Sequence, residues 1–399
     1  MNTNGFSALG LIAPLRRAVE ASGWDEPTPV QAAAIPPALA GRDVIACAMT
    51  GSGKTAAFVL PVLQRLATGR RRGIGALVIT PTRELAMQVE EEVRRLGDGS
   101  GLRSVAVFGG VAAGPQERAL RAGVDVVVAT PGRLLDHMRR PWLRFDGLEI
   151  LVLDEADRML DMGFLPDIRR ILEALPSRRQ TMLFSATMPR PMVRLARDFL
   201  TDPVRFDVER PSAPATGIRQ AVLPVEEGAK RGVLLSMLES GRIGTALVFT
   251  RTKHRANRLA RFLSERGVAC DRIHGNRTQP QRQAALRAFK EGRIRVLVAT
   301  DIAARGIDIA ALPHVINFDV PRQPDDYIHR VGRTARAETT GDALTLVTPG
   351  EHRELAAIER AVGRRIPRLG AEAEDGGRGA RRAPRGGRGR RKPPREGVH

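Results

Sequence analysis

Short apolar runs alternate with helix-like segments along most of the chain. Runs that are rich in β-branched and other apolar residues cover 44–47, 76–80, 105–108, 124–129, 150–153 and 181–184. A second series covers 221–225, 246–249, 295–299, 315–318 and 343–347. Continuous apolar runs of this kind, separated by helical patterns, are typical of strands that are buried on both faces of a parallel sheet. The pattern therefore predicts two consecutive α/β units, each built on its own parallel sheet.

Two segments interrupt this pattern and suggest domain limits. Residues 209–217 are rich in Pro and Ala and have no apolar periodicity, which predicts a linker. From about residue 370 the composition reduces to Gly, Arg and Pro, which leaves too few apolar residues for a core. We therefore expect a first domain at 1–208, a second domain at 218–369 and a disordered basic tail at 370–399. A chain of 399 residues is long enough for two such domains.

The charge of the chain suggests a polyanionic partner. The formal net charge is +20, from 64 basic and 44 acidic residues. Only five of the basic residues are lysines, so 59 are arginines. A genome bias toward Arg codons would explain the choice of Arg over Lys, but it would not explain the excess of base over acid. We therefore expect a binding partner such as a nucleic acid.

Other function classes have little support. Cys47 and Cys270 are the only cysteines, and the seven histidines show no ligand-like spacing, so we expect neither a disulfide framework nor a structural metal site. No apolar stretch approaches the ~18 residues of a membrane span. Residues 6–15 are predicted to form a helix, because no basic region precedes them as it would in a signal peptide. These features predict a cytoplasmic protein.

Residues 48–55 carry the strongest chemical signal. Their sequence is Ala-Met-Thr-Gly-Ser-Gly-Lys-Thr, between an apolar run and a helical pattern. Glycines let a backbone wrap a phosphate group, a lysine can bridge the β- and γ-phosphates, and a threonine hydroxyl can bind Mg²⁺. The segment therefore predicts binding of a nucleoside triphosphate by Thr50, Gly51, Ser52, Gly53, Lys54 and Thr55. Ala48 departs from the usual pattern, which begins with Gly, and a glycine-rich turn without a ligand is the alternative reading.

A second chemical signal follows the run at 150–153, where the sequence continues Asp154-Glu155-Ala156-Asp157. Ligands of parallel α/β sheets collect at the carboxyl ends of strands. Asp154 is therefore predicted to bind Mg²⁺ together with Thr55, and Glu155 to orient or deprotonate the attacking water. Four such residues taken alone would more often be the solvated start of a helix.

The order and spacing of these motifs resemble the DEAD-box ATP-dependent RNA helicases of superfamily 2, over roughly residues 6–345. By its layout the chain is most similar to the bacterial RhlE-like group. The resemblance implies an α/β fold with two tandem RecA-like parallel-sheet domains, joined by a short linker and followed by the disordered basic tail. It also implies that the chain uses ATP and Mg²⁺.

Further segments match the family's nucleotide contacts. Residues 23–31 resemble its adenine-reading segment, which implies that Gln31 reads the adenine edge and that Trp24 stacks on the ring. Phe6 matches the family's isolated upstream aromatic, and Asp308 a second-domain nucleotide contact. Lys54, Asp154, Glu155, Arg333 and Arg336 are the implied catalytic residues, the two arginines reaching the γ-phosphate from the second domain. Ala335 replaces the family's usual Gly between them.

The remaining motifs imply contacts to RNA and coupling between the sites. The implied RNA contacts are Arg83, Gly110, Thr130, Arg133, Arg251, Arg282 and Thr300. Ser185 and Thr187 match the motif that links hydrolysis to domain closure. The tail at 376–399 holds nine basic residues against one acid, which predicts charge-based RNA binding, and a merely solubilising tail is the alternative.

The sequence thus predicts an RNA-dependent ATPase that separates short duplexes or remodels RNA–protein complexes. An ATP-controlled RNA clamp remains an alternative, because the same motifs serve it. A DNA helicase or translocase is disfavoured by the Asp-Glu-Ala-Asp segment and by the adenine-reading segment. A small-molecule kinase would leave the second domain, Arg333 and Arg336 unexplained. The expected partners are RNA, bound with little sequence preference, and ribonucleoprotein or RNA-decay proteins. The chain is expected to be a monomer without membrane contact.

Overall fold

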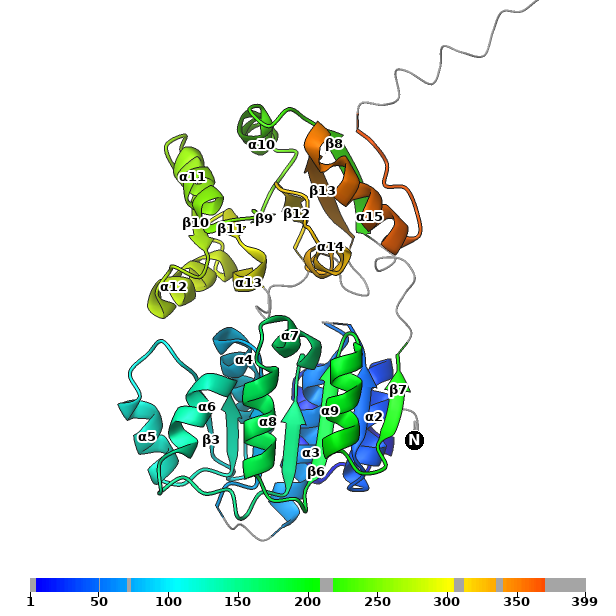
Figure 1. The fold of residues 1–399 in the computed structure, drawn as a ribbon, viewed down its shortest axis with the longest axis vertical. Helices are drawn as coiled ribbons and strands as arrows, with labels where there is room; N and C mark the ends of the chain where they lie inside the picture. The colour runs from blue at the N-terminus through cyan, green and yellow to red at the C-terminus, as the bar shows by residue number, and fades with distance from the viewer. Residues whose placement is uncertain are drawn as a thin grey trace, which may run out of the picture.

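The computed structural model describes residues 5–49, 51–69, 73–208, 218–304, 312–334 and 340–369, and shows two α/β domains in sequence (Figure 1). The fold class predicted from the sequence is confirmed, because each domain is built on a parallel sheet. The predicted linker at 209–217 and the tail at 370–399 lie outside the described residues, as do Thr50, Asp308 and Arg336.

The first domain has a seven-stranded parallel sheet in the order β3-β4-β2-β5-β6-β1-β7. Its strands are β1 (Val44–Cys47), β2 (Ala76–Ile79), β3 (Ser104–Val107), β4 (Val126–Ala129), β5 (Ile150–Leu153), β6 (Gln180–Ser185) and β7 (Val204–Asp207). Its helices are η1 (Phe6–Leu9, a 3₁₀ turn), α1 (Ala13–Ala21), α2 (Pro29–Leu39), α3 (Lys54–Thr68), α4 (Arg83–Leu96), α5 (Gly114–Arg121), α6 (Pro131–Met138), α7 (Ala156–Asp161), α8 (Leu165–Ala174) and α9 (Arg190–Phe199).

The second domain has a six-stranded parallel sheet in the order β10-β11-β9-β12-β13-β8. Its strands are β8 (Ile218–Pro224), β9 (Ala246–Phe249), β10 (Cys270–Ile273), β11 (Val296–Ala299), β12 (His314–Asn317) and β13 (Gly341–Val347). Its helices are α10 (Lys230–Glu239), α11 (Lys253–Ser264), α12 (Gln279–Lys290), α13 (Asp301–Ala304), α14 (Pro324–Val331), the 3₁₀ turn η2 (Pro349–Glu351) and α15 (His352–Val362).

Each sheet is buried on both faces, as the continuous apolar runs predict. In β2, Ala76 and Val78 pack with α3 and α4, whereas Leu77 and Ile79 pack in a second core on the opposite face. The side chains of a strand alternate between faces, so every residue of such a run meets a helix layer. All four residues of β2, β4, β5, β9 and β11 are buried.

Two strands, β7 and β10, were missed by the sequence reading. Both lie at sheet edges, where one side of the strand has no partner. Their sequences, Val-Arg-Phe-Asp and Cys-Asp-Arg-Ile, carry charges because they are only partly buried. Edge strands commonly contain such charges, which prevent pairing with other chains, so an apolar-run criterion does not find them. The strands that were predicted from the sequence are confirmed, and their observed ends differ from the predicted ends by up to three residues.

The two sheets turn their carboxyl edges toward each other. In Figure 1, α7, which follows β5, lies on the side of the first domain that faces the second, and α13 and α14 lie on the facing side of the second domain. Apart from Phe6 and residues 23–31, which precede β1, the motifs singled out in the sequence come after the carboxyl ends of strands, so the topology brings them to the boundary between the domains. None of the helices in the described part of the chain is long and apolar enough to cross a membrane.

Candidate active site between the two domains

The glycine-rich loop connects β1 to α3. Gly51 and Gly53 have φ angles of 85° and 93°, a left-handed conformation that favours glycine. A Cβ atom at Gly53 would also stand 2.6 Å from Nε2 of Gln31. Lys54 is the first residue of α3, and its buried Nζ donates a 2.7 Å hydrogen bond to the carbonyl of Ala48. The backbone amides of Gly53 and Lys54 at the start of this 15-residue helix thus provide a site for an anion.

Gln31 joins this loop to the start of α2. Its Oε1 accepts a 2.9 Å hydrogen bond from the amide of Thr28, which caps α2. Its Nε2 donates a 3.1 Å bond to the carbonyl of Gly53. The side chain is buried, so both ends of the amide are held by the protein. An adenine that Gln31 reads must therefore bind beside these bonds or replace one of them.

The two predicted aromatic contacts pack on each other. The rings of Phe6 and Trp24 stack with centroids 6.2 Å apart, and the guanidinium of Arg95 lies 5.0 Å from the Trp24 centroid. Phe6 is buried, whereas Trp24 is half-buried. Part of the Trp24 surface is therefore exposed, although Phe6 and Arg95 already lie against its ring.

Asp154 and Glu155 follow β5 and are both buried. Burial raises the pKa of Asp154 to about 7, although the nearby Lys54 lowers it. Burial also disfavours the charged form of Glu155, but Arg158 and Lys54 outweigh it and hold the pKa of Glu155 below its ordinary value. Glu155 adopts a left-handed backbone conformation, with φ 50° and ψ 51°. This conformation turns the chain sharply between the strand and α7.

Arg158 is a residue of this site that the sequence reading missed. Its Nη1 lies 2.7 Å from Oε2 of Glu155 in a buried ion pair. Its Nε and Nη2 are also buried and have no hydrogen-bond partner among the described residues. Arg158 was missed because a basic residue early in a helix carries no signal of its own; the only available clue was the spacing of three residues from Glu155.

Asp157 connects the carboxylate segment to the residues after β6. Its backbone amide donates to Oγ of Ser185 at 3.0 Å. Its Oδ2 accepts from the amide of Ala186 at 3.1 Å and from the amide and hydroxyl of Thr187 at 2.8 and 2.9 Å. The two motifs therefore form one hydrogen-bonded unit, and a shift of either would move the other.

A cavity of about 480 Å³ lies between the domains. Lys54, Glu155, Asp157, Arg158 and Thr187 contribute to its lining from the first domain. Gln323, Asp326, His329 and Arg333 contribute from α14 and the residues beside it in the second domain. Of these four, only Arg333 was among the predicted site residues. Gln323 and Asp326 follow no motif pattern, so only the fold reveals that they face the cavity.

The predicted RNA contacts of the first domain lie along its carboxyl edge. The Arg83 guanidinium covers Gly110, which has a φ of 78°, and a Cβ there would stand 1.8 Å from Nη1 of Arg83. The Arg133 guanidinium donates to the carbonyl of Val111 at 3.0 Å. Thr130 is buried as the cap of α6. Arg83, Gly110 and Arg133 thus surround the loop that follows β3.

Arg282, Thr300 and Arg251 are placed differently in the second domain. Arg282 Nη2 lies 3.1 Å from Oε1 of Glu84, across the domain boundary, and 3.4 Å from the carbonyl of Ala303. Thr300 is half-buried at the start of α13. Arg251 instead points into its own domain, where its Nη2 contacts Oε1 of Glu351 at 2.9 Å and the carbonyl of Val320 at 3.1 Å.

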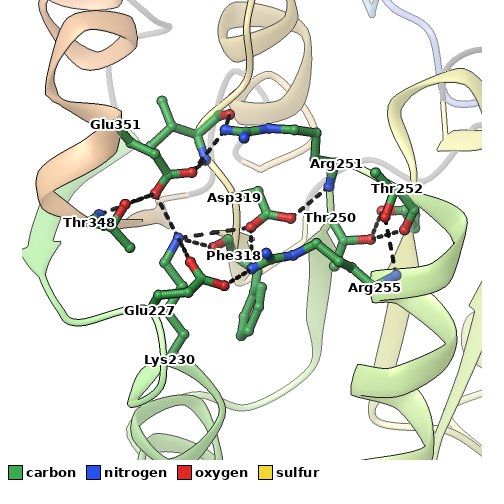
Figure 2. Close-up of polar contacts among 12 residues, drawn as sticks. Glu227, Lys230, Thr250, Arg251, Thr252, Arg255, Phe318, Asp319, Thr348 and Glu351 are labelled. Carbon is green, nitrogen blue, oxygen red and sulfur yellow. Dashed lines mark hydrogen bonds and ion pairs between the residues drawn. The ribbon is translucent and has the colours of Figure 1, made fainter.

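Figure 2 shows the buried network that holds Arg251. Lys230 is fully buried, and its Nζ donates to Oε2 of Glu351 at 2.7 Å and to the carbonyl of Phe318 at 2.9 Å. The amide of Arg251 donates to Asp319 at 2.8 Å. Arg251 thus belongs to a structural network that holds its Nη2, although its side chain is 33% exposed.

Comparisons with known families agree with this geometry. The family model described as DEAD/DEAH box helicase matches residues 28–195, and the model described as helicase conserved C-terminal domain matches residues 229–338. Together the matched residues include the glycine-rich loop, the carboxylate segment and Arg333.

Curated relatives match most of the chain. The DEAD-box ATP-dependent RNA helicase CshA of Bacillus cereus is 46% identical over 370 residues, which are 93% of this chain and 70% of that protein. CshA of Bacillus subtilis is 46% identical over 364 residues, 91% of this chain and 74% of that protein. The finer resemblance to the RhlE-like group is not confirmed by these comparisons.

Solved structures share the fold. The structure of S. cerevisiae Dbp5 bound to RNA and ADP BeF3 matches with a TM-score of 0.83 and 32% identity, over 92% of this chain and 95% of that chain. A DEAD box protein from Methanococcus jannaschii matches with a TM-score of 0.54 and 38% identity, over 92% of this chain and 99% of that chain.

Proposed function

The chain belongs to the DEAD-box family of ATP-dependent RNA helicases, and from that premise we propose that it hydrolyses ATP in the cavity between its domains and thereby separates short RNA duplexes. It is an RNA-dependent ATPase that binds ATP and RNA. One observation carries the proposal for the site: Lys54 and Glu155 of the first domain share a cavity of about 480 Å³ with Arg333 of the second. A triphosphate in that cavity would contact both domains at once.

We propose that the glycine-rich loop and Lys54 hold the phosphates and that Glu155 orients the attacking water. Glu155 suits this role because Arg158 and Lys54 favour its ionised form, which can accept a proton or a hydrogen bond from water. Arg333 would offset the charge that develops as the γ-phosphoryl group leaves. Arg336 is proposed for the same role, and Asp308 for a contact to the nucleotide. Both proposals rest on the motifs alone, because these two residues lie outside the described part of the chain.

The carboxylate segment fits a magnesium ion. Asp154 is buried, and burial raises its pKa although Lys54 opposes the shift, so a bound cation would stabilise its ionised form. Among the described residues no three His, Cys, Asp or Glu side chains form a complete metal cluster. Mg²⁺ needs few protein ligands when substrate phosphates and waters supply the rest. We propose Asp154 and Thr55 as those ligands, and the ion would neutralise phosphate charge.

RNA binding would be coupled to ATP through domain closure. The RNA groove is proposed to combine Arg83, Gly110, Thr130 and Arg133 of the first domain with Arg282 and Thr300 of the second. Since each ligand contacts both domains, each favours the closed arrangement and therefore strengthens binding of the other. Asp157, Ser185 and Thr187 form one hydrogen-bonded unit, and Asp157 lies two residues after Glu155. We propose that this unit couples domain closure to the position of the Glu155 carboxylate.

The match to Dbp5 bound to RNA and ADP BeF3 supports this reading, since it spans both domains at a TM-score of 0.83. Contacts to phosphate and sugar carry little base information, so we propose little sequence preference. An ATP-controlled clamp would use the same contacts but release RNA slowly. We further propose that the chain acts as a monomer in the cytoplasm and meets ribonucleoprotein or RNA-decay partners through the RNA that they share.

Steady-state ATPase assays test the proposal, with no nucleic acid, with single-stranded RNA and with matched DNA. RNA should stimulate hydrolysis and DNA should not, because the choice rests on 2′-hydroxyl contacts. Glu155→Gln should keep ATP binding and lose turnover by orders of magnitude. Hydrolysis by Glu155→Gln near the wild-type rate would overturn the role of Glu155. Wild-type hydrolysis without measurable duplex separation would favour the clamp.

A further inference from the structure

A hollow on the surface of α11 has no role in the function proposed above. It has a volume of about 400 Å³ and is lined by His254, Asn257, Arg258 and Arg261. We call it the α11 hollow. Arg258 and Arg261 are exposed, and neither guanidinium forms an ion pair with a carboxylate in the described part of the chain. The hollow therefore presents two cationic side chains that the described acidic residues leave uncompensated.

The amide of Asn257 has a fixed orientation in the α11 hollow. Its Oδ1 accepts a 2.7 Å hydrogen bond from Nε of Arg272 and lies 3.0 Å from Nε2 of His274. Because a guanidinium can only donate, the oxygen of the amide must face Arg272. The NH₂ group of Asn257 is then the part that is left to face the hollow. Together with Arg258 and Arg261, it lines the hollow with hydrogen-bond donors.

A neighbouring cavity provides a contrast. It has a volume of about 230 Å³, and its lining includes Arg255, Arg258 and the carboxylate of Glu227. Arg255 is already paired there, at 2.6 Å with Glu227 and at 2.8 Å with Asp319. Arg255 thus has its positive charge balanced by carboxylates, whereas Arg258, which lines both cavities, and Arg261 have no acidic partner among the described residues.

Positive charge continues from the hollow to the boundary between the domains. Burial lowers the pKa of His274, and the cations Arg272, Arg277, Lys253 and Arg282 lower it further. These four residues come from β10, α11 and α12 and the residues beside them, which Figure 1 shows on one side of the second domain. Arg282 reaches the boundary itself, where it contacts Glu84. Asp271 lies 3.8 Å from Arg272 and 3.4 Å from Arg277, and Glu84 lies 3.1 Å from Arg282. Four cations thus face two carboxylates here, and net positive charge extends from the proposed RNA groove to the α11 hollow.

We propose that the α11 hollow binds the phosphodiester backbone of RNA that extends beyond the groove between the domains. The inference rests on the proposed function for the strand that enters the groove. Hydrogen-bond donors that have no acceptor within the protein can bind phosphate oxygens. The two parallel N–H groups of an arginine can bind two oxygens of one phosphate. An acidic protein would also match the charge of the hollow. Only a polyanion that is already bound in the groove between the domains would also contact the cations that lie between that groove and the hollow. Because the contacts are to phosphates, this site is indifferent to base sequence.

Two RNAs and two matched variants test the inference in the full chain. One RNA is the shortest single strand that stimulates ATP hydrolysis, and the other is the same strand extended at both ends. The test variant is Arg258→Ala with Arg261→Ala. The control is Arg194→Ala with Arg197→Ala, which removes two exposed arginines at the same spacing on α9 of the first domain. RNA affinity is measured at several salt concentrations.

The test variant should bind the extended RNA less tightly, whereas the control should bind it like the wild type. Two lost phosphate contacts should make the slope of log K against log salt about 1.4 shallower, which corresponds to a loss of up to about 25-fold at 0.1 M salt. Affinity for the short RNA should not change, and this also shows that the variant is folded. Stimulation of ATP hydrolysis by the short RNA in the wild-type protein tests the proposed function separately from this inference.

Two results would overturn the inference. The first is an unchanged slope and affinity of the test variant for the extended RNA. The second uses poly-L-glutamate as a probe: if the test variant loses affinity for this polypeptide but not for the extended RNA, the hollow binds an acidic protein segment instead.

Discussion

Nε2 of Gln279 donates a 2.8 Å hydrogen bond to Oε1 of Glu84, across the boundary between the two domains. The same carboxylate oxygen lies 3.1 Å from the Arg282 guanidinium. Glu84 is only 2% exposed, and it directly follows Arg83, a proposed RNA contact. Contact between the domains is thus built beside the RNA groove as well as around the ATP cavity. Closure on RNA should therefore depend on Glu84.

Glu84→Gln should weaken the stimulation of hydrolysis by RNA. The substitution keeps the size of the side chain but removes the charge that balances Arg282. Coupling energies between sites are typically about 1–3 kcal/mol, so we expect roughly a tenfold loss of RNA stimulation with little change in ATP affinity. Glu91→Gln is the control, because Glu91 is an exposed residue of the same helix. Equal stimulation of Glu84→Gln and the wild type would contradict this prediction.

Gly110→Ala should lower RNA affinity and leave ATP affinity unchanged. The residue has a φ of 78°, and the added Cβ would stand 1.8 Å from Nη1 of Arg83, so the guanidinium has to move. Left-handed strain alone costs about 1–2 kcal/mol. Gly109→Ala is a close control, because its φ is not positive and its Cβ would meet the same guanidinium at 3.7 Å. RNA titrations of both variants decide the matter, and the prediction is wrong if the two bind alike.

The fold and the ATP site differ in how far the sequence could predict them. The buried strands were found because their apolar runs are continuous, as in Ile150–Leu153, and the edge strands β7 and β10 were missed because charges interrupt them. Motifs indicated which residues follow the strands, but the partners of their side chains depend on the fold. The pairing of Arg282 with Glu84, which lies 198 positions earlier, leaves no pattern in the sequence.

Arg251 illustrates the same limit. Its motif implies an RNA contact, and nothing near it in the sequence indicates a competing partner. In the structure Glu351 from η2 lies 2.9 Å from its guanidinium, 100 positions along the chain. Resemblance therefore identified a segment that belongs at the boundary, while only the packing of the second domain determines which atoms are free to meet RNA.

Gln31→Glu should reduce the preference for ATP over GTP. Glutamate keeps the oxygen that accepts from Thr28 but loses the NH₂ group that now donates to Gly53 and is proposed to read adenine. One lost hydrogen bond is worth about 1–1.5 kcal/mol, so the ratio of kcat/KM values for ATP and GTP should fall roughly tenfold. Gln64→Glu is the control, because Gln64 also bonds through both ends of its amide, to Ile12 and Gly10, but outside the nucleotide site. A wild type that uses ATP and GTP equally well would contradict the reading of Gln31.

Lys230→Met should destabilise the second domain. The lysine is fully buried and compensates Glu351 and Asp319, so its loss leaves two buried carboxylates with one cation each, Arg251 and Arg255. Breaking a buried ion pair in this way costs about 3–5 kcal/mol, which equilibrium unfolding in urea can measure. The double variant with Glu351→Gln is the control, because it removes one of these two charges and should recover part of the loss.

The destabilisation by Lys230→Met should also depend on pH. Burial opposes the ionisation of Glu351, but Lys230 and Thr348 outweigh it and hold the pKa of Glu351 below its ordinary value in the folded protein. A depressed carboxyl pKa contributes stability above the unfolded-state pKa, and that contribution is lost as the pH falls through the folded-state value. Without Lys230 the buried carboxyl gains from protonation, so the difference between variant and wild type should be largest at neutral pH and shrink toward acid. A difference that stays constant with pH would mean that packing of the lysine stem, and not its charge, supports the domain.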